Sequence, residues 1–215
     1  MKRVCILPGD GIGPEVIGEA VRLLEAMKLP LELSDPYPIG FGAYEAHGAP
    51  LPDETLAAVA DADAALFGAV TTPPNIPNYS SPILGLRQGL TLFANVRPCK
   101  SFPPTSSRPG IDMVIVRENT EGLYARRERV EDGGDTAITE RIITRAATER
   151  IVRYACDLAV RQGRKRVTLV HKANVLRESD GLFRRVGFEV TAGYPQLEVD
   201  ELLVDACAMH LIRKP

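Results

Sequence analysis

The sequence lacks the features that would place the protein in a membrane, outside the cell or on a nucleic acid. No apolar run approaches the roughly 20 residues of a membrane-spanning helix, and the N-terminus leads into a strand-like segment instead of a signal peptide. The 26 basic and 28 acidic residues give a formal net charge of −2, so no excess of positive charge suggests nucleic-acid binding. These absences predict a cytoplasmic protein without a membrane or nucleic-acid partner.

Cysteine is scarce and scattered. The four cysteines lie far apart, at positions 5, 99, 156 and 207, with no C-x-x-C pair and no histidine at zinc-ligand spacing. We therefore expect reduced, mostly buried thiols. The 215 residues are enough for one large domain or two small ones.

Strand-like apolar runs alternate with segments of helical periodicity, which is typical of an α/β protein with a largely parallel core sheet. The periodicity is clearest at residues 15–27 and 147–161, and Thr144 and Gly163 are suited to cap the second helix. The strand-like runs lie at residues 4–7, 64–70, 93–96, 113–116, 167–170 and 202–204. Loops are expected at residues 72–82, 102–110 and 131–140, and the second is the expected domain boundary.

A glycine-rich turn follows the first strand, in the stretch GDGIGPEV at residues 9–16. Its place between a strand and a helix suits a dinucleotide-binding fingerprint, but Pro14 stands where G-x-G-x-x-G needs its third glycine. Asp35 lies at the distance of the ribose-binding carboxylate, yet Pro36 and Pro38 make a strand end there doubtful. The pattern does not support an ordinary Rossmann fingerprint, so the glycines need another explanation.

Three arginines occupy positions suited to binding a small polycarboxylate. Arg87 shares a predicted helical face with Ile83 and Leu84, whereas Arg97 and Arg117 each end a predicted strand. Open α/β sheets bind ligands at strand ends, and a guanidinium grips a carboxylate with two parallel hydrogen bonds. Any one of these arginines, taken alone, is more often an ordinary surface or salt-bridging residue.

Three further residues could carry proton transfer or metal binding. Tyr124 follows Arg117 in VRENTEGLY and could act as a general acid, or pack in the core. Lys172, next to His171 and just past a predicted buried strand, could act as a base, or be a solvated residue at a strand end. Asp205 alone makes no metal site, although Mg²⁺ often takes only one or two carboxylates together with substrate oxygens and water.

Together these stretches resemble the β-decarboxylating dehydrogenases, the family of isocitrate, 3-isopropylmalate and homoisocitrate dehydrogenases. The resemblance rests on five motifs in the family's order and spacing: GDGIGPEV, LRQGLTLFANVRP, VRENTEGLY, HKANV and VDACAM. It implies the two-domain α/β fold of isocitrate and isopropylmalate dehydrogenases, which is not a Rossmann fold. The first domain would span residues 1–101 and be incomplete here, and the second would span 102–215, with a dimerisation arm near 131–145.

The resemblance also implies roles for individual residues. Tyr124 matches the general acid, and Lys172 matches the lysine that assists deprotonation of the alcohol. Lys172 and the metal ligand Asp205 would both reach in from the partner subunit. The implied substrate-binding residues are Thr72, Leu84, Arg87, Arg97, Arg117, Tyr124, Lys172 and Asn174. The implied cofactor-binding residues are Val70, Thr71, Thr72 and Asn174.

The implied reaction is NAD-dependent oxidative decarboxylation of a hydroxy di- or tricarboxylate with Mg²⁺ or Mn²⁺, in a homodimer or dimer of dimers with shared active sites. The apolar Ile83 and Leu84 suggest isopropylmalate, but VRENTEGLY and its surroundings look most like homoisocitrate dehydrogenase. We therefore expect conversion of homoisocitrate to 2-oxoadipate, in lysine biosynthesis through aminoadipate. The alternatives are 3-isopropylmalate or isocitrate dehydrogenase, and a non-catalytic regulatory subunit or inactive fragment. Family members are longer, so further metal ligands, the adenine site and the choice between NAD and NADP lie outside these 215 residues.

Overall fold

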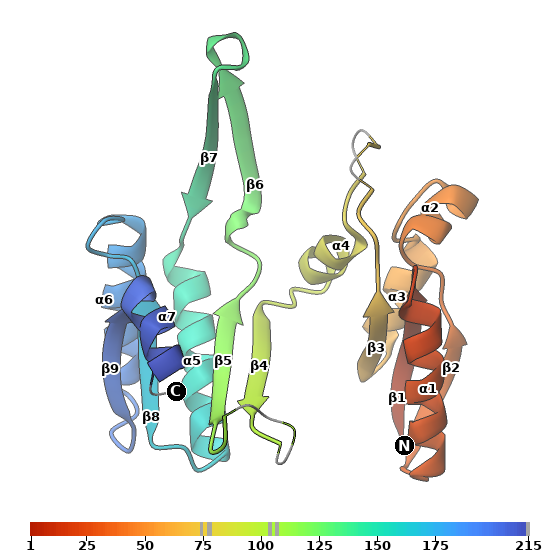
Figure 1. Cartoon of the computed structure of the whole chain (residues 1–215), viewed down its shortest axis with the longest axis horizontal. Coiled ribbons are helices and arrows are strands. Elements are labelled where there is room, and N and C mark those ends of the chain that lie inside the picture. The colour runs from red at the N-terminus through yellow and green to blue at the C-terminus, as the bar shows by residue number, and fades with distance from the viewer. Residues whose placement is uncertain (74, 77–78, 103–104, 106–107, 214–215) are drawn as a thin grey trace. The chain divides into compact units, whose positions relative to one another are not determined.

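The computed structural model describes residues 1–73, 75–76, 79–102, 105 and 108–213, and it divides into two compact units (Figure 1). The units are Met1–Thr91 and Leu92–Pro215, so the division precedes the expected boundary at 101/102. The reason is that β4 (Ala94–Lys100) pairs antiparallel with β5 (Asp112–Glu118). The expected boundary thus falls between two paired strands of the second unit.

The first unit is a parallel three-stranded sheet with the strand order β2-β1-β3. Its elements are β1 (Lys2–Gly9), α1 (Gly13–Ala26), β2 (Leu31–Pro36), α2 (Phe41–His47), α3 (Asp53–Asp61), β3 (Ala64–Ala69) and α4 (Pro82–Gly89). The apolar run of the central strand is buried, and Leu7 is completely inaccessible. The sequence signals missed β2, because Pro36 argues against a strand; an edge strand tolerates it, since its outer side needs no ladder hydrogen bond.

The described strands of the second unit form two-stranded sheets, of which β4–β5 and β6–β7 are antiparallel and β8–β9 is parallel. The elements after β5 are β6 (Gly122–Glu131), the 3-10 turn η1 (Asp132–Gly134), β7 (Thr136–Ile142), α5 (Arg145–Arg161), β8 (Arg166–His171), α6 (Ser179–Thr191), β9 (Glu198–Leu203) and α7 (Val204–Arg213). The expectation of a largely parallel sheet is therefore confirmed for the first unit and for β8–β9, and it is wrong for the other two pairs.

The 17-residue helix α5 organises the core of the second unit. Thr144 caps it as predicted, because its side chain accepts a hydrogen bond from the Ala147 N–H at 3.2 Å. Gly163 follows its C-terminus with φ +65°, a conformation that suits glycine. The core cluster consists of Ile151, Val152, Cys156, Ala159, Leu169 and Leu197. Among the described helices, none is long and apolar enough to cross a membrane.

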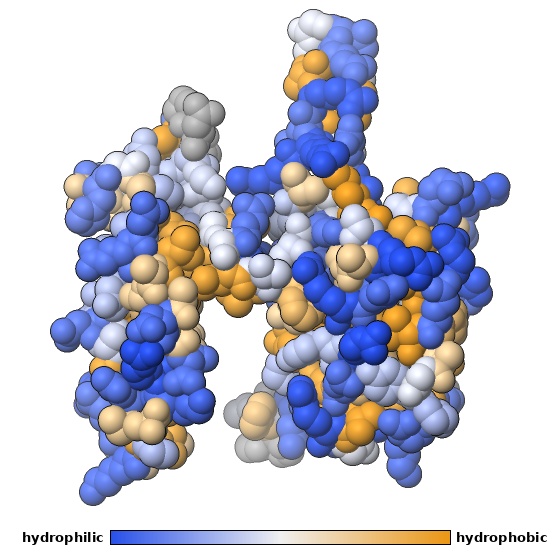
Figure 2. All heavy atoms as spheres, turned by 180° about the vertical axis from the view of Figure 1, so that it is seen from behind, coloured by the Kyte–Doolittle hydropathy of each residue, from blue (hydrophilic) through white to orange (hydrophobic). Residues whose placement is uncertain are grey.

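The charged segment at 131–140 is not a loop but the outer part of the β6–β7 hairpin, which projects from the rest of its unit (Figure 1). Figure 2 shows this projection mainly in hydrophilic colours. Arg129 donates to Glu140 across the two strands at 3.0 Å. Both faces of the hairpin are solvated, so its sequence lacks the apolar alternation that normally predicts a strand.

The four cysteines are unpaired thiols, as expected. Cys5 and Cys156 are buried, whereas Cys99 and Cys207 are half-buried. Burial raises the pKa of the Cys156 thiol to about 11, because the interior disfavours the thiolate. Cys156 is therefore a core residue and not a nucleophile.

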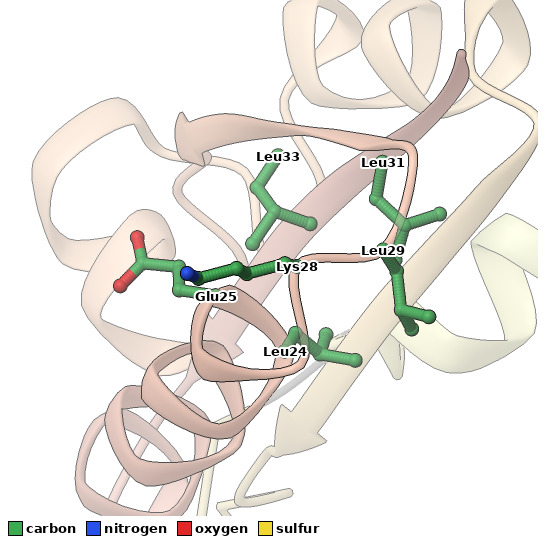
Figure 3. Close-up of a pocket in the computed structure, with 6 residues that line it drawn as sticks. All are labelled: Leu24, Glu25, Lys28, Leu29, Leu31 and Leu33. Atoms are coloured by element: carbon green, nitrogen blue, oxygen red, sulfur yellow. The ribbon is translucent and has the colours of Figure 1, made fainter.

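A groove of about 350 Å³ lies in the first unit, between the C-terminal end of α1 and β2 (Figure 3). Its lining residues are Leu24, Glu25, Lys28, Leu29, Leu31 and Leu33. None of the site residues predicted from the sequence lines it. The groove therefore takes no part in the candidate site.

Candidate functional site

The glycine-rich turn packs backbone against backbone at the end of β3. The Asp10 N–H donates to the Ala69 carbonyl at 2.6 Å. A Cβ on Gly9 would lie 1.8 Å from that carbonyl oxygen, and a Cβ on Gly13 would lie 2.1 Å from the Pro8 carbonyl oxygen. Gly9 also has φ +78°, which disfavours any side chain. Gly9 and Gly13 are thus needed for close packing of the turn, which explains these two glycines without a Rossmann fingerprint.

Asp10 connects this turn to the predicted cofactor segment. Its carboxylate accepts from the N–H groups of Phe41 at 2.6 Å, Gly42 at 3.0 Å and Thr71 at 3.3 Å. It therefore fixes both the start of α2 and the chain just after β3. Residues 70–72 lie there, with both threonines exposed at the C-terminal end of a parallel strand, where open α/β sheets bind ligands. Sequence reasoning missed Asp10, whose only signal was its position between two glycines.

Arg87 lies in the first unit on α4, which begins at Pro82 with Ser81 as its N-cap residue. Ile83 and Leu84 precede Arg87 by four and three positions, so all three lie on one side of the helix. All three are half-buried. The other two predicted substrate-binding arginines belong to the second unit.

Arg97 lies in the middle of β4, so the expectation that it ends a strand is wrong. Pro98 does not stop the strand, because an edge strand tolerates a residue without an N–H. Asn95 pairs with Arg117 across the two strands, and Arg97 follows Asn95 by two residues. Arg97 and Arg117 are therefore diagonal neighbours on one face of the sheet. Arg97 Nε donates to Asn95 Oδ1 at 3.0 Å.

Tyr124 contacts the second of these arginines directly. Arg117 Nη2 donates to the Tyr124 hydroxyl oxygen at 2.6 Å, and its guanidinium carbon lies 5.0 Å from the ring centroid. A hydroxyl that accepts from a cation still carries its own proton as a donor. The pair therefore combines a guanidinium suited to bind a carboxylate with a hydroxyl able to act as a general acid.

An irregularity in the hairpin brings Tyr124 to this position. The pairing advances from Gly122 to Arg127 on β6, but only from Ile142 to Glu140 on β7. The extra residues on β6 form a bulge that contains Tyr124. Bulges re-aim side chains in this way and are frequent next to active sites.

Lys172 and Asp205 form an ion pair at the edge of the parallel β8–β9 sheet. Lys172 directly follows β8 and Asp205 lies in the first turn of α7, directly after β9. The hydrogen bond from Lys172 lowers the pKa of Asp205, which favours the ionised carboxylate that Mg²⁺ or Mn²⁺ binds. Asn174 lies exposed in the turn after Lys172. In the described part of the chain, no group of three or more His, Cys, Asp or Glu residues is arranged as a metal site.

Near this edge of the sheet, Glu201 on β9 is the carboxylate whose pKa is lowered most. Arg184 donates to it twice, and His171 Nε2 lies 2.9 Å from its Oε2. These contacts, with Arg184 first and His171 second, lower the pKa of Glu201 to about 2. The carboxylate is only about one-third exposed.

Glu201 should make the second unit sensitive to acid. Its folded pKa lies below the ordinary value of 4.5, so the ionised form contributes stability above about pH 4.5 that is lost as the pH falls toward 2. We expect Glu201→Gln to melt at a lower temperature than the wild type at pH 7, with a difference that shrinks between pH 5 and pH 2.5. Melting curves recorded across this range test the assignment. A difference that stays constant with pH would contradict it.

The sequence of this chain is similar to those of known proteins. The family described as isocitrate/isopropylmalate dehydrogenase matches residues 3–215. An isocitrate/homoisocitrate dehydrogenase of Thermus thermophilus is 45% identical over 214 residues, which cover 99% of this chain and 63% of that protein. A 3-isopropylmalate dehydrogenase of Archaeoglobus fulgidus is 46% identical over 216 residues, which cover 100% of this chain and 64% of that protein.

A solved structure extends the similarity to the fold. The crystal structure of isocitrate dehydrogenase from Methylococcus capsulatus matches with a TM-score of 0.93 and 42% identity, over 100% of this chain and 64% of that one. This match confirms the two-domain α/β fold that the five motifs predicted. The chain spans about 63% of the length of the curated relatives that it matches.

Proposed function

This chain belongs to the isocitrate/isopropylmalate dehydrogenase family, and we propose that the complete polypeptide catalyses NAD-dependent oxidative decarboxylation of a 3-substituted malate. The observation that carries the proposal is that each proton-transfer candidate contacts the group its role requires. Tyr124 accepts from the carboxylate anchor Arg117 at 2.6 Å, and Lys172 pairs with the candidate metal ligand Asp205. Such pairing of reactive and positioning groups is typical of an active site.

Two of the arginines orient the substrate. Arg97 and Arg117 present guanidinium groups on one face of β4–β5, a spacing suited to the two carboxylates of a malate core. Arg87 on α4 is the third proposed anchor. Fixing both carboxylates holds the carbinol carbon in one orientation, which lowers the entropic cost of the reaction.

The remaining residues move protons. Lys172 assists removal of the hydroxyl proton as the carbinol C–H leaves as hydride, which gives the β-keto acid. The bond between the carbon next to the new ketone and the carboxylate on that carbon then breaks and releases CO₂, and Tyr124 donates a proton to the same carbon. Asp205 would hold the metal ion, and residues 70–72 with Asn174 would contact the cofactor. Bound at these residues, a nicotinamide would supply the hydride acceptor and a metal ion would supply Lewis-acid stabilisation of the substrate oxygens.

We further propose that the working unit is a homodimer, or a dimer of dimers, with shared active sites. The projecting β6–β7 hairpin is the arm expected to cross to the partner (Figure 1). Lys172 and Asp205 would then serve the site of the partner subunit, while Arg117 and Tyr124 serve their own. Complementation between a Lys172→Met subunit and a Tyr124→Phe subunit in mixed dimers would support this arrangement.

Homoisocitrate is the proposed substrate, with 3-isopropylmalate and isocitrate as the alternatives. Ile83 and Leu84 give an apolar surface near the third arginine, on which the methylenes of a longer carboxyalkyl chain can lie. The shorter chain of isocitrate would bring its extra carboxylate closer to these groups, where an unpaired charge is costly. Comparing kcat/KM for the three acids tests the choice. A clear preference for isopropylmalate would overturn it.

Replacing Tyr124 by phenylalanine should impair the reaction after hydride transfer. The variant keeps the ring over Arg117 but lacks the proton that the final carbon needs. We expect the variant to show a first-turnover burst of reduced nicotinamide while its steady-state turnover falls by about 10²–10⁴-fold. Tyr194→Phe is the matched control, because that hydroxyl bonds Asp157 and not a site arginine. A variant that loses the burst and the steady state equally would argue against the assigned role.

A further inference from the structure

We propose that Asp180 and His171 are positioning residues that hold the backbone of Lys172 and Ala173, so that the Lys172 side chain starts from a fixed point. The proposal rests on the proposed function and deepens its account of the lysine. We call these two side chains the amide clamp. Neither is predicted to contact the substrate.

Asp180 holds the first amide. It lies in the first turn of α6, is only 2% exposed, and its Oδ2 accepts from the Lys172 N–H at 2.6 Å. Its Oδ1 pairs with Arg141, at the base of the β6–β7 hairpin. A carboxylate this deeply buried is tolerated only when it is paired and hydrogen-bonded, and here both requirements are met by groups from other elements.

His171 holds the next amide. It is the last residue of β8, is only 6% exposed, and its Nδ1 accepts from the Ala173 N–H at 3.1 Å. An accepting Nδ1 leaves the proton on Nε2, which faces Glu201 at 2.9 Å. Arg184 fixes Glu201 in turn. This chain of contacts sets both the ring orientation and the tautomer of the histidine.

The two held amides are consecutive, and they lie where the sheet ends. The β8–β9 pairing stops at His171 and Leu203, so the ladder offers no partner to Lys172 or Ala173. The turn is closed on its other side by hydrogen bonds from the N–H groups of residues 175 and 176 to the Lys172 carbonyl. Because the backbone is held on both sides, the position of the Lys172 ammonium group depends only on the side-chain torsions. Asp205 restricts these torsions by pairing with the ammonium group.

This arrangement has a kinetic consequence. Misplacing a reacting group by about 1 Å can cost on the order of 10²-fold in rate. The three proposed arginine anchors lie on other elements, so loosening this turn should lower turnover much more than it weakens substrate binding. If the two residues had a purely structural role, their substitution would instead lower the melting temperature without lowering kcat selectively at unchanged KM.

A matched pair of histidine variants tests the clamp in the complete polypeptide. His171→Asn places an amide oxygen near the position of Nδ1 and can still accept from Ala173, whereas His171→Gln places its amide near Nε2 and cannot. We expect His171→Asn to keep most of kcat. His171→Gln should lose about 10–100-fold in kcat, as substitutions that disturb a supporting contact often do, with KM within about twofold of the wild type.

Two companion measurements complete the test. Glu178→Gln, an exposed change in the same turn that precedes α6, should leave kcat unchanged. Hydrogen exchange of the Ala173 amide should accelerate in His171→Gln and not in His171→Asn. Equal kcat values in the two histidine variants, or unchanged amide exchange in His171→Gln, would overturn the clamp. A wild-type enzyme that oxidises none of the three acids would refute the proposed function instead, and the exchange comparison would still decide whether His171 holds the amide.

Discussion

Replacing Lys172 by methionine is expected to lower kcat by about 10²–10⁴-fold in the complete polypeptide, the usual contribution of a general acid or base. Methionine has nearly the length of the lysine side chain but cannot assist removal of the hydroxyl proton. The partner of the ion pair, Asp205, is 65% exposed, so water can solvate its carboxylate once the ammonium is gone. The variant should therefore fold normally and fail in catalysis.

The matched control for this change is Lys165→Met, an exposed lysine just before β8. It makes the same chemical change outside the candidate site and should leave kcat close to the wild-type value. Initial rates of cofactor reduction at saturating substrate give the comparison. Near-normal turnover in Lys172→Met, with melting temperatures matched among the three proteins, would remove the lysine from the mechanism.

The second large effect concerns the stability of the first unit. Gly13→Ala should destabilise it by at least about 1–3 kcal/mol, because the new Cβ would sit 2.1 Å from the Pro8 carbonyl oxygen and backbone would have to move. Gly18→Ala, five residues further along α1, meets nothing within 4 Å. That change should be neutral or stabilising by about 0.5–1 kcal/mol, since alanine favours helix more than glycine does.

Urea unfolding of both glycine variants and the wild type measures this difference. The same substitution in the same helix is thus expected to lower the free energy of unfolding at Gly13 and not at Gly18, because the added methyl group meets backbone only at Gly13. If Gly13→Ala is as stable as Gly18→Ala, close packing does not account for the glycine at that position. The explanation of GDGIGPEV as a tightly packed turn would then be wrong.

The sequence predicted those elements whose burial follows a simple period. The strands β1, β3 and β8 appear as apolar runs, and α5 shows apolar residues at helical spacing between its two caps. β2 was missed because Pro36 argues against a strand. Proline is excluded from central strands, but an edge strand such as β2 tolerates it. The β6–β7 hairpin was missed because neither of its faces is buried, so its composition is that of a charged loop.

The individual site residues were predictable, but most of their partners were not. Arg117 and Tyr124 were singled out from VRENTEGLY, yet their contact depends on a bulge in β6 that the residue pattern does not predict. Asp10, Asp180 and Glu201 could not be distinguished from surface carboxylates in the sequence. Their importance comes from donors supplied by distant segments, which only the tertiary fold brings together.

The most direct test of the central claim is the stoichiometry of the reaction. The complete polypeptide is incubated with homoisocitrate, isopropylmalate or isocitrate in turn, together with NAD⁺ and Mg²⁺, and reduced nicotinamide and released CO₂ are measured in the same sample. We predict that the two products form in a one-to-one ratio with at least one acid, most efficiently with homoisocitrate. Reduced nicotinamide without CO₂, or neither product with any of the three acids, would contradict the account.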